Sequence, residues 1–152
     1  MKSITTLAGA ALAAFGLGTE AAAVSFSPAS TAFTARGPIT LTKAGVQFSC
    51  AGLVSGRTDA TGVGHIYRAS FTGSQACRAI TAAGLPWRMK AHTLSRANIL
   101  GVTLSTPQGA CGPGRVKPKI THGEFRFKAD PLPPDCVVEA NLSTSPKISI
   151  VP

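Results

Sequence analysis

The sequence predicts an all-β protein, an antiparallel sandwich or barrel of about nine short strands held by disulfides. Short segments in which apolar and polar residues alternate are separated by turn residues, and the 16 Gly and 11 Pro supply these breaks. Helix signals are poor, because residues 74–83 offer at most a turn or two and are diluted by Gly and Thr. The four Cys supply the third observation, since in an exported domain they indicate disulfides.

The clearest strand follows a turn at residues 83–86 and contains the single Trp of the chain. Its residues alternate with the period of two that is typical of a half-buried strand. One side carries Leu85, Trp87, Met89 and Ala91, and the other carries Arg88, Lys90 and His92. We therefore expect Trp87 to be a core residue and the opposite side to be a basic face.

The first half of the chain has an irregular, Ser- and Thr-rich beginning and then a series of strands. Its expected elements are an edge strand at 32–35, strands at 39–43 and 46–50 with a continuation to Val54, a polar turn at 58–62, and a strand at 65–71. In the last of these strands, Tyr67, Ala69 and Phe71 are expected to point into the core.

The second half continues in the same manner. Its expected elements are a strand at 99–106 with Leu100, Val102 and Leu104 on one face, a Gly-Pro-Gly turn at 112–114, strands at 116–121 and 124–128, a rigid Pro-rich loop at 130–135, and strands at 136–142 and 147–151. Phe125 and Phe127 are expected to face the core.

The beginning of the chain has the layout of a secretory signal peptide. A positive start, Met1-Lys2, precedes an apolar segment at 4–17 and an Ala-x-Ala cleavage site at 21–23. We expect residues 1–23 to be the signal peptide and residues 24–152 to form a single secreted β domain. The alternative is an amphipathic N-terminal helix of the mature domain. No second segment is long and apolar enough for a membrane anchor, so we expect an exported protein that is periplasmic, on the cell surface or extracellular.

The four Cys, Cys50, Cys77, Cys111 and Cys136, are more typical of two disulfides than of a zinc site, which would need close Cys pairs. Three pairings are possible. A weak repeat of Cys, turn, strands, loop and Cys favours Cys50–Cys77 and Cys111–Cys136. Closing a loop of about 25 residues in this way stabilises a domain by roughly 3 kcal/mol.

The formal net charge of +9 favours anionic partners such as lipid headgroups, lipopolysaccharide, polysaccharides or nucleic acid. Lys43 and a larger set of cations lie opposite the apolar residues of the predicted strands. The candidate contacts to an anionic surface are Arg88, Lys90, Lys117, Lys119, Arg126 and Lys128. The alternative is that strand order scatters these cations over both sides of the domain. Nucleic acid is disfavoured as a partner because few aromatic side chains accompany the charge.

Catalytic and metal-binding patterns are absent from the sequence. There is no Gly-x-Ser-x-Gly motif, and Asp130 and Asp135 are better explained as turn residues than as a carboxylate pair. Nothing in the spacing of His65, His92 and His122 requires them to converge on a metal. We expect a protein that is not an enzyme and that has no cofactor and no metal.

Several segments resemble the PraB-like family of small exported bacterial proteins, the protein activators of alkane oxidation. These segments are Ile-Thr-Leu-Thr-Lys at 39–43, Ala-Ser-Phe-Thr-Gly-Ser at 69–74, the run from 79 to Gly-Leu-Pro-Trp at 84–87, Cys136, and Thr-Ser-Pro-Lys at 144–147. The resemblance covers residues 30–152. Family members are rich in Thr and Ser and carry few charges, so this chain departs from the family in its charge.

The resemblance implies a secreted or cell-surface protein that assists contact with, or uptake of, hydrophobic substrate and has no catalytic residues. Related family members are tied to biofilm or adhesion. The alternative is therefore a biofilm matrix or adhesion protein, and the basic face of this chain would let it bind anionic surface polymers. A small secreted enzyme with an unrecognised site is the alternative from a different functional class.

Overall fold

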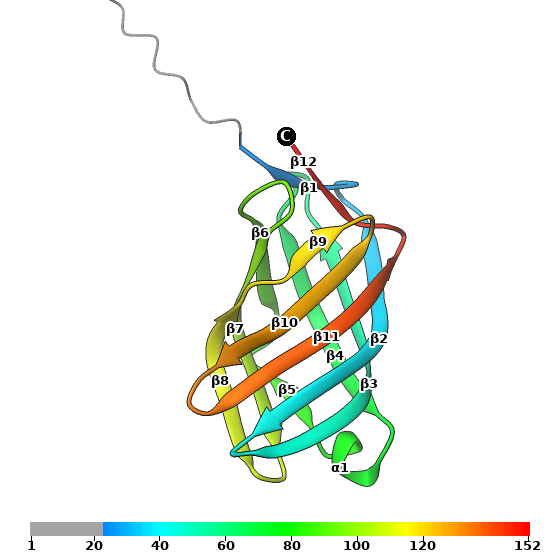
Figure 1. Cartoon of the computed structure of the whole chain (residues 1–152). Coiled ribbons are helices and arrows are strands. Elements are labelled where there is room, and N and C mark those ends of the chain that lie inside the picture. Colours follow the sequence, from blue (N-terminus) through cyan, green and yellow to red (C-terminus); the bar gives the residue numbers. More distant parts are fainter. Residues whose placement is uncertain (1–22) are drawn as a thin grey trace, which may run out of the picture.

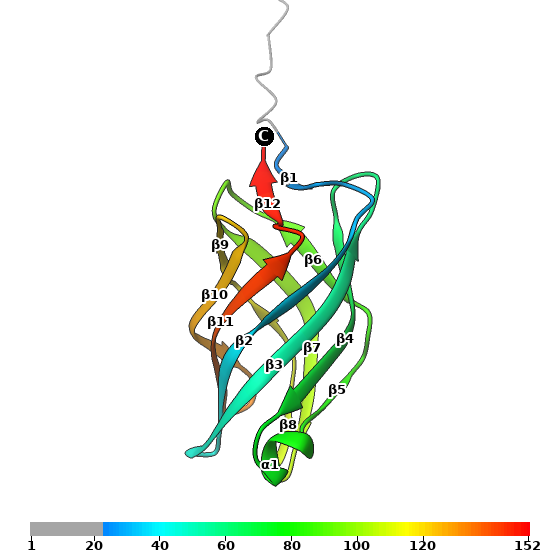
Figure 2. The same ribbon diagram turned by 90° about the vertical axis from the view of Figure 1, so that its right-hand side faces the viewer.

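Ten strands form one antiparallel sheet that curls around an apolar core, as Figure 1 shows. The computed structural model describes residues 23–152, so the predicted signal peptide lies outside the described residues except for Ala23. Two short strands pair separately at one end, and the single helical turn lies at the other (Figure 2). The predicted all-β fold class is confirmed, although the strands number twelve in the described chain.

Hydrogen bonding orders the sheet β5-β7-β6-β4-β3-β2-β11-β10-β9, with β8 added to β7 and with β1 pairing with β12 outside it. The elements are β1 (Ser25–Ser27), β2 (Ala32–Lys43), β3 (Val46–Thr58), β4 (Gly64–Thr72), α1 (Gln75–Arg78), β5 (Thr81–Ala83), β6 (Trp87–Ala91), β7 (Ala97–Thr106), β8 (Gly109–Val116), β9 (Lys119–Thr121), β10 (Glu124–Leu132), β11 (Cys136–Ser145) and β12 (Ser149–Val151).

The longest hairpin joins β2 to β3 through a two-residue turn. Ala44 and Gly45 both have positive φ, 50° and 80°, which matches the turn type that suits the twist of paired strands. Lys43 pairs with Val46 next to the turn, and the ladder continues without a break to Ala32 and Arg57. The predicted strands at 32–35 and 39–43 are therefore one continuous strand.

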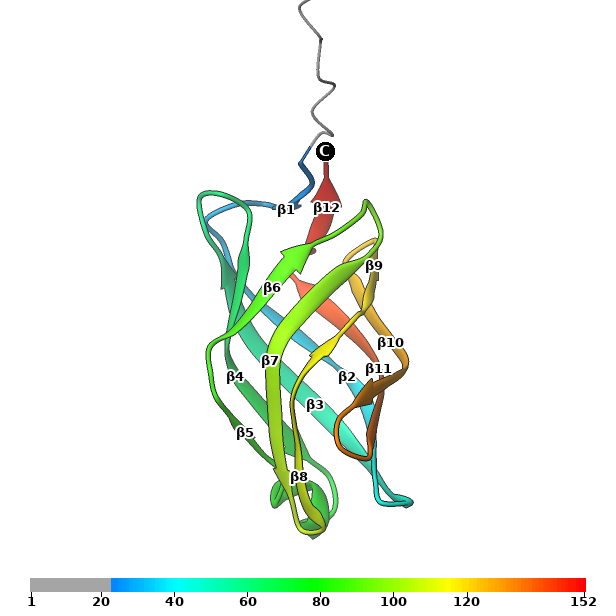
Figure 3. The same cartoon turned by 90° about the vertical axis from the view of Figure 1, so that its left-hand side faces the viewer.

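The two ends of the sheet approach each other without forming one closed ladder. Near β7 and β9, the N–H of Ala97 donates to the carbonyl of Pro118 (3.2 Å), and the N–H of Ile120 donates to the carbonyl of Ser95 (2.8 Å). Further along, β8 lies beside β10 (Figure 3), and the N–H of Gly112 bonds to the carbonyl of Pro133. The sheet thus has a barrel-like form with a loosely bonded line between β8 and β10.

Trp87 lies in the core on β6, as its alternating pattern predicts. Its side chain is 5% exposed, and its Nε1–H donates to the carbonyl of Ala83 at 2.8 Å. Met89 is also buried, whereas Arg88 and Lys90 point to solvent. The end of β5 therefore fixes the indole, because Ala83 provides the acceptor for the one polar group of that side chain.

Two disulfides link elements that are not paired in the sheet. Cys50–Cys77 joins β3 to α1, and Cys111–Cys136 joins β8 to β11. These are the pairs that the weak repeat in the sequence favours. The Ser74 side chain caps α1 by accepting from the N–H of Cys77, so the helical turn places that Cys against β3.

Several predicted side-chain directions are wrong because β-bulges shift the alternation. Tyr67 was expected in the core, but it is 55% exposed. Ser55 pairs with Arg68 and Gly56 with Ile66, so Tyr67 is the extra residue of a bulge in β4. Leu100 is likewise exposed, and Ile99 takes its place in the core. The pairing of β7 with β8 shifts register just beyond it.

Two predicted breaks are also wrong, because the chain stays in the sheet through Pro and Gly. Residues 112–114 lie within β8, and β10 continues to Leu132 through part of the predicted Pro-rich loop. Both strands lie along the loosely bonded line, where a missing N–H disturbs few ladder hydrogen bonds. Composition alone therefore predicted turns at positions where edge strands form.

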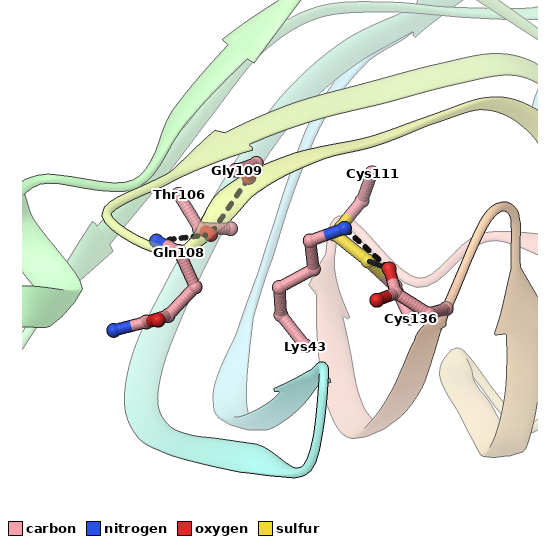
Figure 4. The surroundings of a disulfide bond; sticks show 7 residues. Lys43, Thr106, Gln108, Gly109, Cys111 and Cys136 are labelled. Carbon is pink, nitrogen blue, oxygen red and sulfur yellow. Dashed lines mark hydrogen bonds and ion pairs between the residues drawn. A yellow bond between two sulfur atoms is a disulfide. The ribbon is translucent and has the colours of Figure 1, made fainter.

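Lys43 is not on the outward basic face, which corrects another expectation. Its side chain is only 8% exposed, and its amino group forms an ion pair with Asp135, close to Cys111–Cys136 (Figure 4). The Asp135 side chain is 47% exposed. The pair therefore attaches the end of the β2–β3 hairpin to the turn between β10 and β11.

This unequal burial predicts unequal effects of removing each partner. Asp135→Ala should lower the free energy of unfolding by about 1–3 kcal/mol, because it leaves a buried ammonium without its acceptor. Lys43→Met should cost less than about 1 kcal/mol, because the remaining carboxylate keeps contact with water. Denaturant unfolding of both variants measures the difference, and a larger loss in Lys43→Met would contradict this explanation.

Candidate functional site

An apolar cavity of about 60 Å³ lies inside the curled sheet. Eight strands contribute to its wall, and every residue that lines it is apolar. The lining residues are Ile39, Gly52, Val54, Ile66, Ala69, Phe71, Trp87, Ile99, Val102, Leu104, Val116, Phe125, Phe127, Val138 and Leu142. The cavity therefore occupies the middle of the core and not a loop cluster.

Small residues on β3 and β4 contribute to this space. Gly52 pairs with Phe71, and Val54 pairs with Ala69. Of these four residues only Phe71 has a large side chain, so the wall on this side leaves space open. Larger side chains, among them Trp87 and Phe125, line the cavity from other strands. A cavity without polar groups stays dry and can take up an apolar guest.

A second hollow lies on the outer surface of the sheet and is basic. This basic groove has a volume of about 680 Å³ and extends over β2, β11, β10, β9 and the segment before β7, four strands of which lie side by side in Figure 1. Its lining residues are Pro38, Thr40, Arg96, Lys119, Arg126, Phe127, Lys128, Glu139, Ala140 and Asn141.

Strand pairing brings three cations of the groove into one row. Arg96 forms a bridge with Lys119, and Lys119 pairs with Arg126. Asn141 extends the row on β11 as the partner of Arg126. Directly opposite residues have Cβ atoms about 4.5–5.5 Å apart, and like charges at this spacing repel each other. The folded chain therefore holds a concentrated positive charge here.

The structure brings three of the six predicted surface cations together. Lys119, Arg126 and Lys128 line the groove, whereas Arg88, Lys90 and Lys117 are exposed outside it. Arg88 and Lys90 lie on β6, opposite Leu100 and Asn98 of β7. Sequence reasoning missed Arg96, because it lies in a connecting segment, residues 92–96, where no alternation marks its direction.

The aspartates do not form a carboxylate pair. Partial burial raises the pKa of Asp130, although the backbone N–H of Lys117 and the charges of Arg96 and Lys117 act in the opposite direction. Asp135 binds Lys43 instead.

In the turn after β3, the hydroxyl of Thr61 and the ring of His65 hold the pKa of Asp59 well below its usual range. Within residues 23–152, no three His, Cys, Asp or Glu side chains converge as metal ligands. No helix in this part of the chain has the length and apolarity needed to cross a membrane.

Comparison with known protein families gives a match over the whole chain. The model of a family described as alkane oxidation protein activator PraA/PraB-like matches residues 1–152, the whole chain. Neither a curated protein nor a solved structure matches.

Proposed function

Because the chain belongs to the alkane oxidation protein activator PraA/PraB-like family, we propose that it is an exported, non-catalytic protein that assists contact with or uptake of hydrophobic substrate. In this proposal the apolar cavity receives the end of an alkyl chain. The observation that carries it is the lining of the cavity, which has no polar or charged side chain. Binding there depends on the hydrophobic effect and on van der Waals contact.

The size of the cavity limits what can enter. An engineered cavity of about 150 Å³ in another protein binds benzene, so a cavity of about 60 Å³ accommodates only a few carbon atoms. A longer chain needs the wall to move. The line between β8 and β10, where strand hydrogen bonds are sparse, is the place where the wall separates at least cost.

Two other features support export and binding of alkane in the interior. The two disulfides suit an oxidising compartment outside the cytoplasm. The exposed large apolar side chains lie on five separate segments, so the surface offers little contact area to an alkane and the interior offers more. These side chains are Val46, Tyr67, Leu94, Leu100 and Val137.

Uptake of a short alkane can be tested on the purified domain with a matched pair of variants. Val138 lines the cavity, and its neighbour Val137 points to solvent on the same strand. In buffer saturated with n-hexane, we expect the methyl signals of Val138 and other lining residues to shift in NMR spectra and the melting temperature to rise. Val138→Phe should abolish both effects, and Val137→Phe should retain them.

Val138→Leu fills less of the cavity and provides a second variant if the Phe side chain prevents folding. Methyl signals that stay unchanged in the parent protein would refute uptake into the cavity. An equal response in Val138→Phe and the parent would place any bound alkane elsewhere.

A further inference from the structure

We propose that the basic groove binds a segment of an acidic polysaccharide, with the carboxylates of the sugar units held by Arg96, Lys119, Arg126 and Lys128. This site is on the outer surface of the sheet and is independent of the apolar cavity. Its volume, about 680 Å³, is within the range of about 300–1,000 Å³ that is usual for ligand sites.

The first argument is the excess of positive charge in the groove, whose lining has four cations and one carboxylate, that of Glu139. Arg126 has an exposed ion pair with Glu124 at 3.3 Å, and such pairs contribute little. Arg96, Lys119 and Lys128 form no ion pair within residues 23–152. Because strand pairing forces Arg96, Lys119 and Arg126 side by side, an anion placed among them relieves repulsion that the folded chain cannot relieve alone.

The second argument is the spacing of the cations, which suits several anionic groups on one chain. The row from Arg96 to Arg126 crosses three neighbouring segments, each about 4.8 Å from the next. Lys128 lies further along β10, beyond Arg126, where a bulge interrupts the pairing with β11. Arginine binds carboxylate through two parallel hydrogen bonds, whereas lysine acts as a point charge.

The third argument is the polar lining between the cations, which favours a sugar over a bare anion. The side chains of Thr40, Glu139 and Asn141 make no hydrogen bond within the described chain, so they are available to hydroxyl groups. Glu139 repels any anionic group placed next to it but accepts hydrogen bonds from hydroxyls. A ligand that carries carboxylates and hydroxyls at separate positions can therefore satisfy both the cations and the polar side chains of the lining.

The shape of the site argues against a lipid surface as the occupant. The charges lie in a groove, which a flat layer of headgroups cannot enter. None of the exposed large apolar side chains lines the groove, and its Phe127 is buried, so no large apolar side chain projects from it to insert between lipids.

The test compares two double variants that remove the same charge. Arg96→Ser/Lys119→Ser removes two cations from the groove, and Arg88→Ser/Lys90→Ser removes two exposed cations from β6. Oligomers of galacturonic acid serve as the probe, and their methyl esters provide the same backbone without charge. Calorimetric titration at low ionic strength gives the dissociation constants.

We expect the groove variant to bind the acidic oligomer at least about tenfold more weakly, because each lost charged hydrogen bond accounts for about that factor. The β6 variant should change affinity less than about twofold, since its charges lie outside the site. The methyl esters should bind the parent protein as weakly as the acidic oligomer binds the groove variant. Lys119→Arg should retain binding, because it keeps the charge.

Equal weakening in the two double variants would overturn the proposal, because it would show a general effect of net charge. Absence of binding by the parent would overturn it as well. Anionic phospholipid vesicles could also displace the oligomer from the parent protein. If the groove variant no longer bound these vesicles, the proposal would be overturned and the groove assigned to lipid. Since both groove residues are exposed and repel each other, the melting temperature of this variant should not fall, which separates lost binding from lost folding.

Discussion

Replacing Trp87 with Ala is expected to lower the free energy of unfolding by about 3–5 kcal/mol. The indole is 5% exposed, lines the apolar cavity and donates to the carbonyl of Ala83. The substitution removes apolar burial, enlarges a space that is already empty and leaves that carbonyl without its donor. Urea unfolding followed by circular dichroism measures the loss.

Trp87→Phe is the matched control, because it keeps an aromatic ring and removes the hydrogen bond. Its cost should be clearly smaller than that of Trp87→Ala. A Trp87→Ala protein whose free energy of unfolding lies within about 1 kcal/mol of the parent's would contradict this prediction. It would mean that the sheet collapses to fill the space of the missing ring. If the enlarged cavity persists, the variant should respond to larger alkanes than the parent, which connects stability to the proposed uptake.

The predictions that succeeded depend on alternation over an unbroken ladder. β6 is one such case, because Trp87 and Met89 are buried and Arg88 and Lys90 are exposed. β11 is another, with strict alternation from Cys136 to Ser145. In these strands the period of two translates directly into an inner and an outer face.

The predictions that failed lie at bulges and at strands with incomplete pairing. The direction of Tyr67 depends on whether β3 and β4 pair in register, and no local pattern in the sequence indicates the extra residue. Pro and Gly within β8 look like a turn because they usually form one. Their place in a strand depends on the neighbouring strand, which is a property of the whole fold.

The basic groove shows the same limit. The outward direction of Lys119 and Arg126 follows from alternation, but their proximity to Arg96 follows from the approach of the sheet ends. For Lys43 the direction itself is predicted wrongly. Alternation suggests an outer position, but the ion pair with Asp135 holds the side chain buried at the end of the sheet. The alternation within single strands therefore predicts which charged side chains point outward, whereas the curl of the sheet determines which of them lie close together.

Removing Cys111–Cys136 is expected to destabilise the domain by about 3–4 kcal/mol and to loosen β8 selectively. β8 pairs only with β7 in the described chain, so this disulfide is its covalent link to the β10–β11 hairpin. The chain-entropy model predicts nearly the same loss for Cys50–Cys77, because the loops span 25 and 27 residues. Double Cys→Ala variants of the two bonds thus form a matched pair.

Hydrogen exchange distinguishes the two bonds where total stability does not. In the Cys111→Ala/Cys136→Ala variant, amides of β8 and the adjoining part of β10 should lose protection before those of β2 and β3, because few hydrogen bonds remain along the line between β8 and β10. In the Cys50→Ala/Cys77→Ala variant, the earliest loss should instead be at α1 and its surroundings. If β8 opens as described, n-hexane should enter and leave the cavity faster in the first variant than in the second. Unchanged protection in β8 would contradict opening of the wall along this line.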